Sequence, residues 1–340
     1  MTKAVIMNAR VLDGAANGQA RVAQALADRL TLEQVSTKAS GMKGHLWEQT
    51  MLPLGAKGRL LWSPSTSGPI FYRNQVVTVH DVAFLDVPEY FTPSFAKAYG
   101  AIVPRLVRNA RWTVTISNFS KQRILEYVPE AEGKISVIFN GVADTFSPGG
   151  EAAARLVASA GVPWKRYFLY FAGADRRKNA RVVTEAWKAI VDQLPPDVGL
   201  VSYGRRSTEL VFGADAAEEV APRSLSLGGV SEEMLVALLS SAEAMVFPSL
   251  YEGFGLPVLE AMACGCPVIC SNTTSLPEVA GGAAIEVAPD SAGELAQAML
   301  KLASDPALAD RLRAAGLARA GEFSWDRSAG QYRDLFEALA

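Results

Sequence analysis

Histidine and cysteine, the usual ligands of zinc, are scarce in this sequence of 340 residues, which contains only two histidines and three cysteines. The cysteines are close together at Cys264, Cys266 and Cys270. An odd trio on an apolar segment lacks the fourth ligand of a structural zinc site. We therefore predict that the three cysteines are buried free thiols.

Long uncharged apolar runs are also absent, so the sequence predicts no transmembrane helix. The first residues lead directly into a short apolar strand and do not resemble a signal peptide. The chain is 49% apolar and 20% charged, which argues against long disordered regions. We expect a cytoplasmic protein, and peripheral contact with the inner face of the cell membrane stays open.

Charge is unevenly distributed although the net charge is only -2. Residues 1–160 contain 17 Lys and Arg against 12 Asp and Glu, and the remainder contains 16 against 23. One stretch of the first half, residues 91–125, has no acid at all and carries a basic run. This run predicts contact with anionic lipid or a phosphorylated acceptor, and a solvated helix face is the alternative. Its members are Lys97, Arg105, Arg108, Arg111, Lys121 and Arg123.

Apolar runs of strand length alternate with helical patterns along the whole chain, which is typical of parallel sheets built from βαβ units. We predict two doubly wound, Rossmann-like α/β domains, residues 1–160 and 161–322, followed by a helical segment, residues 323–340. In such sheets ligands bind beyond the carboxyl ends of the strands. Strands are expected near residues 4–8, 34–36, 60–63, 76–80, 113–117 and 136–140, and then near 167–172, 198–203, 224–227, 244–247, 267–270 and 284–287.

The most informative segment is residues 252–260, which reads Glu-Gly-Phe-Gly-Leu-Pro-Val-Leu-Glu. Pro257 suits the first position of a helix, and the free backbone N–H groups of that helix point at the preceding glycine turn. An anion is stabilised there. Glu252 and Glu260 can accept hydrogen bonds from sugar hydroxyls. The segment predicts a site for a phosphorylated sugar, and a turn with two solvated glutamates is the alternative.

A cluster of cations follows another strand, at residues 175–179, which read Asp-Arg-Arg-Lys-Asn. Three consecutive cations repel one another unless an anion lies among them, and an Arg guanidinium matches the geometry of phosphate oxygens. We predict that this cluster binds the same diphosphate as the turn at residue 252. A solvated surface loop is the alternative.

Two further candidates follow strands of the first half. His80 ends an apolar strand, where an imidazole can orient a ligand hydroxyl and Asp81 can fix its tautomer. Gly18 opens a helix, where a donor phosphate or sugar can approach the backbone. A structural histidine and a glycine required only for packing are the respective alternatives.

These segments resemble the motifs of retaining glycosyltransferase family four, the glycosyl transferases group 1, and the mannosyltransferases among them. The similarity extends over nearly the whole chain. It also includes Val-His-Asp-Val-Ala-Phe-Leu at residues 79–85, Thr-Ile-Ser-Asn-Phe-Ser-Lys at 115–121, Asn-Gly-Val at 140–142 and Ser-Leu-Pro-Glu-Val at 275–279. The resemblance implies a GT-B fold, with two Rossmann-like domains facing each other across a cleft and the C-terminal helix packing back on the N-terminal domain.

The resemblance also implies a role for each candidate residue. Arg177 and Lys178 would bind the donor diphosphate, and Glu260 would bind the ribose hydroxyls. Glu252 would contact the donor sugar, and His80 would orient sugar or acceptor near the reacting centre. The implied donor site is completed by Gly18, Gly253, Phe254, Gly255 and Leu256.

We expect a retaining hexosyltransferase that moves a hexose, with mannose favoured, from a nucleoside diphosphate sugar to a cell-surface polysaccharide or a lipid-linked glycan. The resemblance implies a reaction without a metal or another cofactor, and the sequence contains no D-x-D triplet that could hold a cation on the diphosphate. A dehydrogenase is disfavoured because the glycine turn lacks the third glycine of a dinucleotide fingerprint. A sugar-nucleotide epimerase and a non-catalytic nucleotide-sugar-binding protein are the alternatives. No nucleic-acid partner is expected.

Overall fold

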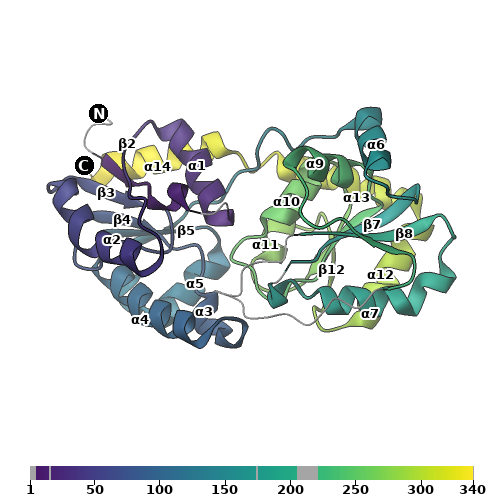
Figure 1. Ribbon diagram of the computed structural model, residues 1–340, viewed down its shortest axis with the longest axis horizontal. Coiled ribbons are helices and arrows are strands. Elements are labelled where there is room, and N and C mark those ends of the chain that lie inside the picture. The colour runs from purple at the N-terminus through teal and green to yellow at the C-terminus, as the bar shows by residue number, and fades with distance from the viewer. Residues whose placement is uncertain (1–4, 15–16, 174, 205–220, 340) are drawn as a thin grey trace. The chain divides into compact units, whose positions relative to one another are not determined.

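The structure is a computed structural model that describes residues 5–14, 17–173, 175–204 and 221–339. Within these residues the strands form two parallel sheets of six strands each, with helices on their faces (Figure 1). The first sheet has the order β2 (Glu33–Val35), β1 (Val5–Asn8), β3 (Leu60–Ser63), β4 (Gln75–Thr78), β5 (Trp112–Thr115), β6 (Ile135–Val137). The second has the order β12 (Ile285–Val287), β11 (Val268–Ser271), β10 (Ala244–Phe247), β7 (Arg166–Phe171), β8 (Val198–Tyr203), β9 (Ser224–Ser226).

All neighbouring strands run parallel, so the predicted doubly wound α/β fold is confirmed. Each expected strand is present, although residue 4, where the first was expected to begin, lies outside the described residues. The strands could be predicted because helices cover both faces of a parallel sheet, so a central strand is apolar throughout. The residues of β3, β10 and β11, for example, are all buried.

Both sheets reverse their strand order once. In the first sheet β2 is added on one side of β1, and β3, β4, β5 and β6 are added in turn on the other side of β1. The reversal therefore lies between β1 and β3. In the second sheet the reversal lies between β7 and β10. Helices leave the sheet toward opposite faces at such a point, and the loops beyond the carboxyl ends of the two strands become accessible to a ligand.

The helices of the first half place apolar stripes on the sheet. In α1 (Gly18–Leu30) the buried residues are Val22, Ala23, Leu26, Ala27 and Leu30, at the spacing of one helix face. Asn17 caps this helix by accepting a hydrogen bond from the Ala20 amide at 2.9 Å. The other helices are α2 (Gly41–Ala56), α3 (Ala83–Asp86), α4 (Pro93–Asn109) and α5 (Asn118–Tyr127).

The second half contains α6 (Gly150–Ser159), α7 (Ala180–Ile190), α9 (Glu232–Ser241), α10 (Leu256–Ala263), α11 (Leu276–Ala280), α12 (Ala292–Ser304) and α13 (Pro306–Ala320). Trp187 of α7 is fully buried in the core beside Phe168 of β7. Cys264, Cys266 and Cys270 are buried free thiols, as predicted, and burial raises the pKa of each thiol to about 12.

The chain divides into two compact units, and their boundary differs from the expected one. Unit 1 comprises residues 1–88, 93–141 and 323–340, and unit 2 comprises residues 89–92 and 142–322. The sequence placed the boundary after residue 160, because residues 147–163 have the composition of a linker. In the structure this segment contains α6, which packs against α9, and Ser240 of α9 binds the Gly149 amide at 3.0 Å. Residues 142–160 therefore belong with unit 2.

The C-terminal helix α14 (Trp325–Leu339) lies in unit 1 beside α1, although the two helices are at opposite ends of the chain (Figure 1). Tyr332 packs against Trp62 of β3 with ring centroids 5.1 Å apart, and its hydroxyl is 2.9 Å from that of Thr78 in β4. The Ser328 hydroxyl donates to the Phe139 carbonyl at 2.6 Å. Buried aromatic packing and buried hydrogen bonds thus attach α14 to the sheet.

No described helix is both long enough and apolar enough to cross a bilayer.

Gly141 provides a test of how α14 is seated. A β-carbon at this position would lie 2.2 Å from the Trp325 backbone nitrogen, so Gly141→Ala forces the start of α14 away from its seat. We expect a loss of about 1–3 kcal/mol in the free energy of unfolding, measured by urea denaturation. Gly293→Ala is the matched control, because a β-carbon there meets nothing within 4 Å and alanine favours the helix. Equal stability of the two variants would contradict this packing.

Candidate functional site in unit 2

The predicted donor residues of unit 2 meet where its sheet reverses strand order. Lys178 follows β7 and Glu252 follows β10, and β7 and β10 are parallel neighbours. The Lys178 ammonium donates to Glu252 Oε1 at 2.5 Å, and both side chains are largely buried. Lys178 Nζ also lies 5.1 Å from the centroid of the Phe247 ring, at the end of β10. The structure thus brings together two residues that are 74 positions apart in the sequence.

Arg177 is fixed by the aspartate that precedes it. Asp175 accepts from Arg177 Nε at 3.0 Å and from Nη2 at 2.7 Å, which is a bidentate pair. The Asp175 carboxylate also accepts from the Arg177 amide at 3.1 Å and caps the short 3-10 helix η5 (Arg176–Lys178). Burial favours a neutral Asp175, but the bonds from Arg177 and the charge of Lys178 outweigh it, so the pKa of Asp175 lies below its ordinary value.

The loop after β10 binds the backbone of this cation cluster. The Arg177 carbonyl accepts from the Leu250 amide at 2.7 Å and from the Ser249 hydroxyl at 3.0 Å. Asn179 adopts a left-handed conformation, with φ of 58°, and its side-chain amide donates to the Pro248 carbonyl at 3.1 Å. The two loops are therefore held together by backbone contacts as well as by the Lys178–Glu252 ion pair.

The glycine turn is held from the other side by the loop after β11. The Ser275 hydroxyl lies 2.9 Å from the Glu252 carbonyl and 2.8 Å from the Phe254 carbonyl, and donates to them. The Glu252 amide donates to the Thr274 hydroxyl at 3.3 Å. Gly255, with φ of 113°, caps α10, and a β-carbon there would lie 2.6 Å from Leu276 Cδ2. Only glycine fits this position.

The helix after the turn begins at Leu256, with Pro257 in its first turn, close to the expected start. Gly253, Phe254 and Gly255 lead into its N-terminus, where a helix stabilises an anion. Glu260 lies on α10 with only 4% of its surface exposed. Its expected contact with a ribose, like the roles of Gly253 to Leu256, stays a prediction.

The two candidates of the first half belong to unit 1. His80 follows β4 and is buried; its Nε2 is 2.9 Å from the Pro64 carbonyl, and its amide donates to the Thr66 hydroxyl at 3.2 Å. Burial lowers the pKa of His80, so the ring is neutral at pH 7. The carbonyl of Pro64 binds the ring, whereas the Asp81 carboxylate, expected to fix the tautomer, accepts from the Ala83 amide at 3.0 Å.

Gly18 is the first residue of α1, and a β-carbon there would meet nothing within 4 Å. Packing therefore does not require a glycine at this position. The neighbouring Gln19 makes the contact to the loop after β3, because its side-chain amide lies 3.3 Å from both the Thr66 hydroxyl and the Thr66 amide nitrogen. This pair could not be predicted from the sequence, since two polar side chains 47 positions apart follow no local pattern.

A buried ionic cluster beneath this loop was also not predicted. The Glu48 side chain is almost completely buried on α2 and accepts hydrogen bonds from Arg10 Nη2 at 3.0 Å, Asn8 Nδ2 at 2.9 Å and the Ser67 hydroxyl at 3.1 Å. Burial favours its neutral form, but the bonds from His45 and Arg10 outweigh it and lower the pKa of Glu48. His45, which the sequence did not assign, lies 3.2 Å from this carboxylate.

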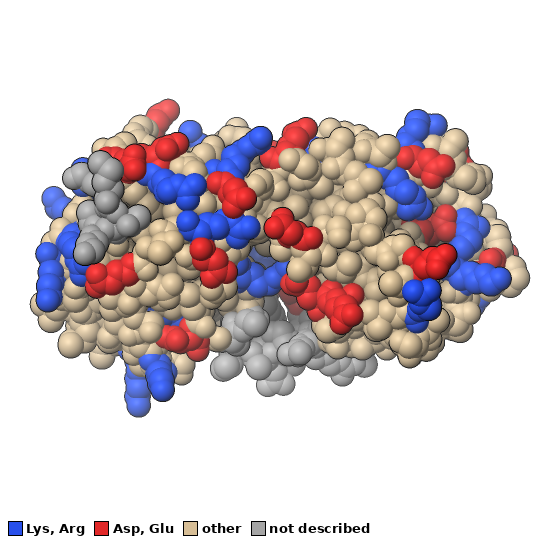
Figure 2. All heavy atoms as spheres, turned by 90° about the horizontal axis from the view of Figure 1, so that it is seen from above, with Lys and Arg blue, Asp and Glu red and all other residues tan. Residues whose placement is uncertain are grey.

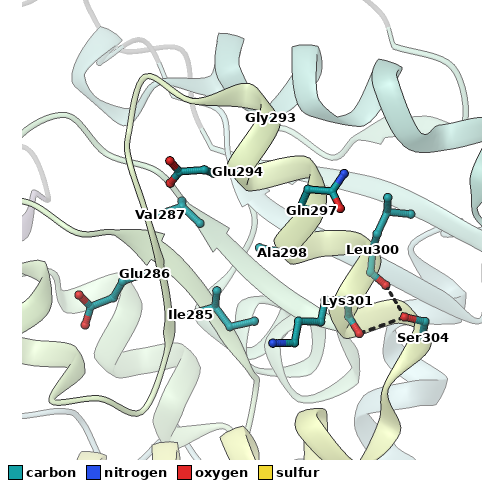
Figure 3. A pocket seen from close by; sticks show the side chains of 10 residues that line it. All are labelled: Ile285, Glu286, Val287, Gly293, Glu294, Gln297, Ala298, Leu300, Lys301 and Ser304. Carbon is teal, nitrogen blue, oxygen red and sulfur yellow. Dashed lines mark hydrogen bonds between the residues drawn. The ribbon is translucent and has the colours of Figure 1, made fainter.

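A surface groove of the described residues lies elsewhere in unit 2. It has a volume of about 800 Å³ between the edge strand β12 and α12, and Figure 3 shows Ile285, Val287, Gln297 and Lys301 along it. None of the predicted donor residues lines this groove. The strand ends of β7 and β10, rather than the groove, are the candidate site.

Comparison with known proteins matches residues 158–319, which contain the whole of this site, to the family described as "Glycosyl transferases group 1". The O-antigen chain mannosyltransferase B of Escherichia coli is 30% identical over 284 residues, which are 80% of this chain and 74% of that protein. The chain belongs to the glycosyl transferases group 1.

Other relatives are considerably longer. The serotype-specific mannosyltransferase WbdA of Escherichia coli is 30% identical over 277 residues, which are 75% of this chain and only 32% of WbdA.

The sucrose-phosphate synthase of Thermosynechococcus elongatus has the same fold, with a TM-score of 0.76, 19% identity and 98% of each chain covered. The predicted GT-B fold and glycosyltransferase activity are thus confirmed, and the epimerase and non-catalytic alternatives are not favoured.

The ion pair of Asp175 with Arg177 predicts that the stability of this glycosyltransferase depends on pH. Because the native pKa of Asp175 is lowered, its stabilisation is present above the unfolded pKa of about 3.9 and is lost as the pH falls through the lower native value. We expect Asp175→Asn to unfold at a lower urea concentration than the wild type at pH 7. The difference between the two midpoint concentrations should shrink as the pH decreases below about 4. Asp192→Asn, in a 3-10 turn of the same unit, is the control. A difference that does not vary with pH would contradict the assignment.

Proposed function

We propose that this glycosyltransferase transfers mannose from GDP-mannose, with retention of configuration and without a metal, to a cell-surface polysaccharide or a lipid-linked glycan. UDP-hexoses are the next donors to consider. Membership of the family is established, whereas the donor sugar and base, the stereochemistry and the class of acceptor are proposed here.

The ion pair between Lys178 and Glu252 is the observation that carries the proposal. A cation and a hydroxyl-accepting carboxylate in contact at a helix N-terminus suit the two halves of a nucleotide sugar, phosphate and hexose. The names of two relatives quoted above support mannose, because one is an O-antigen chain mannosyltransferase and the other a serotype-specific mannosyltransferase. In the proposed mechanism, Arg177 and Lys178 stabilise the leaving diphosphate, Glu252 orients the hexose, and the neutral His80 orients sugar or acceptor.

Substitutions of Lys178 and Glu252 should affect different properties, donor binding and hexose transfer respectively. Lys178→Ala removes a cation from the diphosphate and should weaken donor binding by roughly 1.5–3 kcal/mol, measured by calorimetry. Glu252→Ala should abolish transfer in a radiolabelled-hexose assay, because the hexose loses the carboxylate that orients it, and circular dichroism checks that the variant folds. Lys165→Ala, an exposed lysine of the same unit, is the control and should retain both properties. Full turnover by Glu252→Ala, or unchanged donor affinity of Lys178→Ala, would remove that residue from the site.

The donor itself is identified by thermal stabilisation. A ligand that binds only the folded protein raises its melting temperature by mass action, and at a hundredfold excess over Kd it adds about 2.7 kcal/mol of stability. We expect GDP-mannose to give the largest shift in a panel of nucleotide sugars, and the shift and the turnover to be unchanged by EDTA. A larger shift with a UDP-hexose would replace the sugar and base, and loss of turnover with EDTA would overturn metal independence.

A further inference from the structure

One face of α2 is both apolar and exposed. Met42, Leu46 and Leu54 are exposed by 86%, 63% and 70%. Together with Thr50 they follow the four-residue spacing of a single helix face. Met51, exposed by 57%, widens the face. Large hydrophobic side chains are individually common at surfaces, but a contiguous set on one helix marks an interaction surface.

A neighbouring loop extends this surface. The side chain of Gln49 on α2 accepts from the Ile70 amide at 2.9 Å and donates to the Gly68 carbonyl at 2.9 Å. These bonds hold the loop against the helix, and the next residue, Phe71, is 86% exposed. We call Met42, Leu46, Met51, Leu54 and Phe71 the α2 surface.

The opposite face of α2 packs against the core of unit 1. Leu52 and Ala56 are fully buried against Ile6 and Leu61 of the sheet, and Glu48 forms the ionic cluster described above. Apolar residues therefore surround α2, which is typical of a helix that is covered on both sides. Within the described residues of unit 1, the α2 surface has no such cover.

The charges around the α2 surface are predominantly positive. From residue 34 to residue 80 the sequence has five Lys and Arg and a single acid, Glu48, whose carboxylate is buried and bound by Arg10. Arg59 is paired with Glu33 at 2.7 Å. The other four cations are exposed: Lys38, Lys43, Lys57 and Arg73.

Two other surfaces of the described residues carry both signs of charge. In the basic run, Arg123 is paired with Asp86 at 2.6 Å and Arg108 with Glu130 at 3.3 Å, so acids outside the run neutralise part of its charge. On the face shown in Figure 2, Lys and Arg are interspersed with Asp and Glu. An excess of exposed cations together with exposed apolar side chains is the combination that binds anionic lipid surfaces.

We propose that the α2 surface docks on a bilayer containing anionic lipids, with its apolar side chains among the headgroups and its four cations on the lipid phosphates. A second copy of the chain is the weaker occupant, because a twofold contact would oppose two rims of like charge. The proposal deepens the proposed function, since a lipid-linked acceptor would be met at such a surface. The docking itself requires no catalysis.

Co-sedimentation with vesicles tests the docking with the full chain. The vesicles contain equal parts of phosphatidylglycerol and phosphatidylcholine, or phosphatidylcholine alone, and we expect the protein to prefer the anionic ones. Leu46→Glu with Leu54→Glu should weaken binding roughly tenfold or more, because both side chains leave the apolar layer. Lys43→Ala with Lys57→Ala should weaken it about fivefold for each cation removed.

Matched controls are available in unit 2. Leu317→Glu replaces a leucine that is 42% exposed, and Lys165→Ala an exposed lysine, and both should bind vesicles like the wild type. Circular dichroism checks the folding of every variant. Binding of the double glutamate variant at the wild-type level would overturn the proposal. A different result would also overturn it: the wild type forms a dimer in sedimentation velocity and does not bind vesicles, and the double glutamate variant is a monomer.

Transfer to a water-soluble acceptor separates the two proposals. The variants of the α2 surface should retain it, because none of them alters a residue assigned to the donor site. Vesicle binding without any transferase activity would overturn the proposed function alone, and activity without vesicle binding would overturn the docking alone.

Discussion

The candidate site depends on one constraint, the parallel alignment of β7 and β10 at the point where the second sheet reverses its strand order. The strands end at the same edge, so the loops that follow them start side by side, whereas their helices, α7 and α10, are free to leave in different directions. Hydrogen bonds from Ser249 and Leu250 to the Arg177 carbonyl then fix one loop on the other. Without this alignment the charges of Lys178 and Glu252 would not meet, and a third loop, through Ser275, could not hold the glycine turn.

Four charged side chains of the candidate site form two ion pairs within the protein. Lys178 is paired with Glu252 and Arg177 with Asp175, and all four side chains are largely buried. Such pairs remove most of the cost of burying isolated charges before a ligand arrives. In the proposed donor site, a diphosphate would therefore compete with two carboxylates for its cations. A strongly charged ligand would be favoured over a weaker anion in this competition.

The sequence was sufficient to predict the fold and to place Lys178 and Glu252 after strands of the second sheet, for physical reasons that also explain what it missed. A buried parallel strand such as β3 is apolar on both faces and is recognisable locally. The segment before residue 160 is different, because an alanine-rich helix such as α6 has the composition of a linker until its packing on α9 is known. Asp175, Ser275 and the pair of Gln19 with Thr66 were missed for another reason. Their function lies in hydrogen bonds between distant positions, which leave no periodic pattern in the sequence.

The place of α14 in unit 1 has a consequence for the order of folding during synthesis. This helix is made after the whole of unit 2, yet it covers Trp62 and supplies the hydroxyl partner of Thr78 in the sheet of unit 1. While the ribosome synthesises unit 2, the seat of α14 on β3 and β4 remains uncovered, although the strands of unit 1 have already been made. Unit 2 is contiguous except for residues 89–92 and can complete its core first. The half of the chain that is synthesised first is therefore the half that finishes folding last.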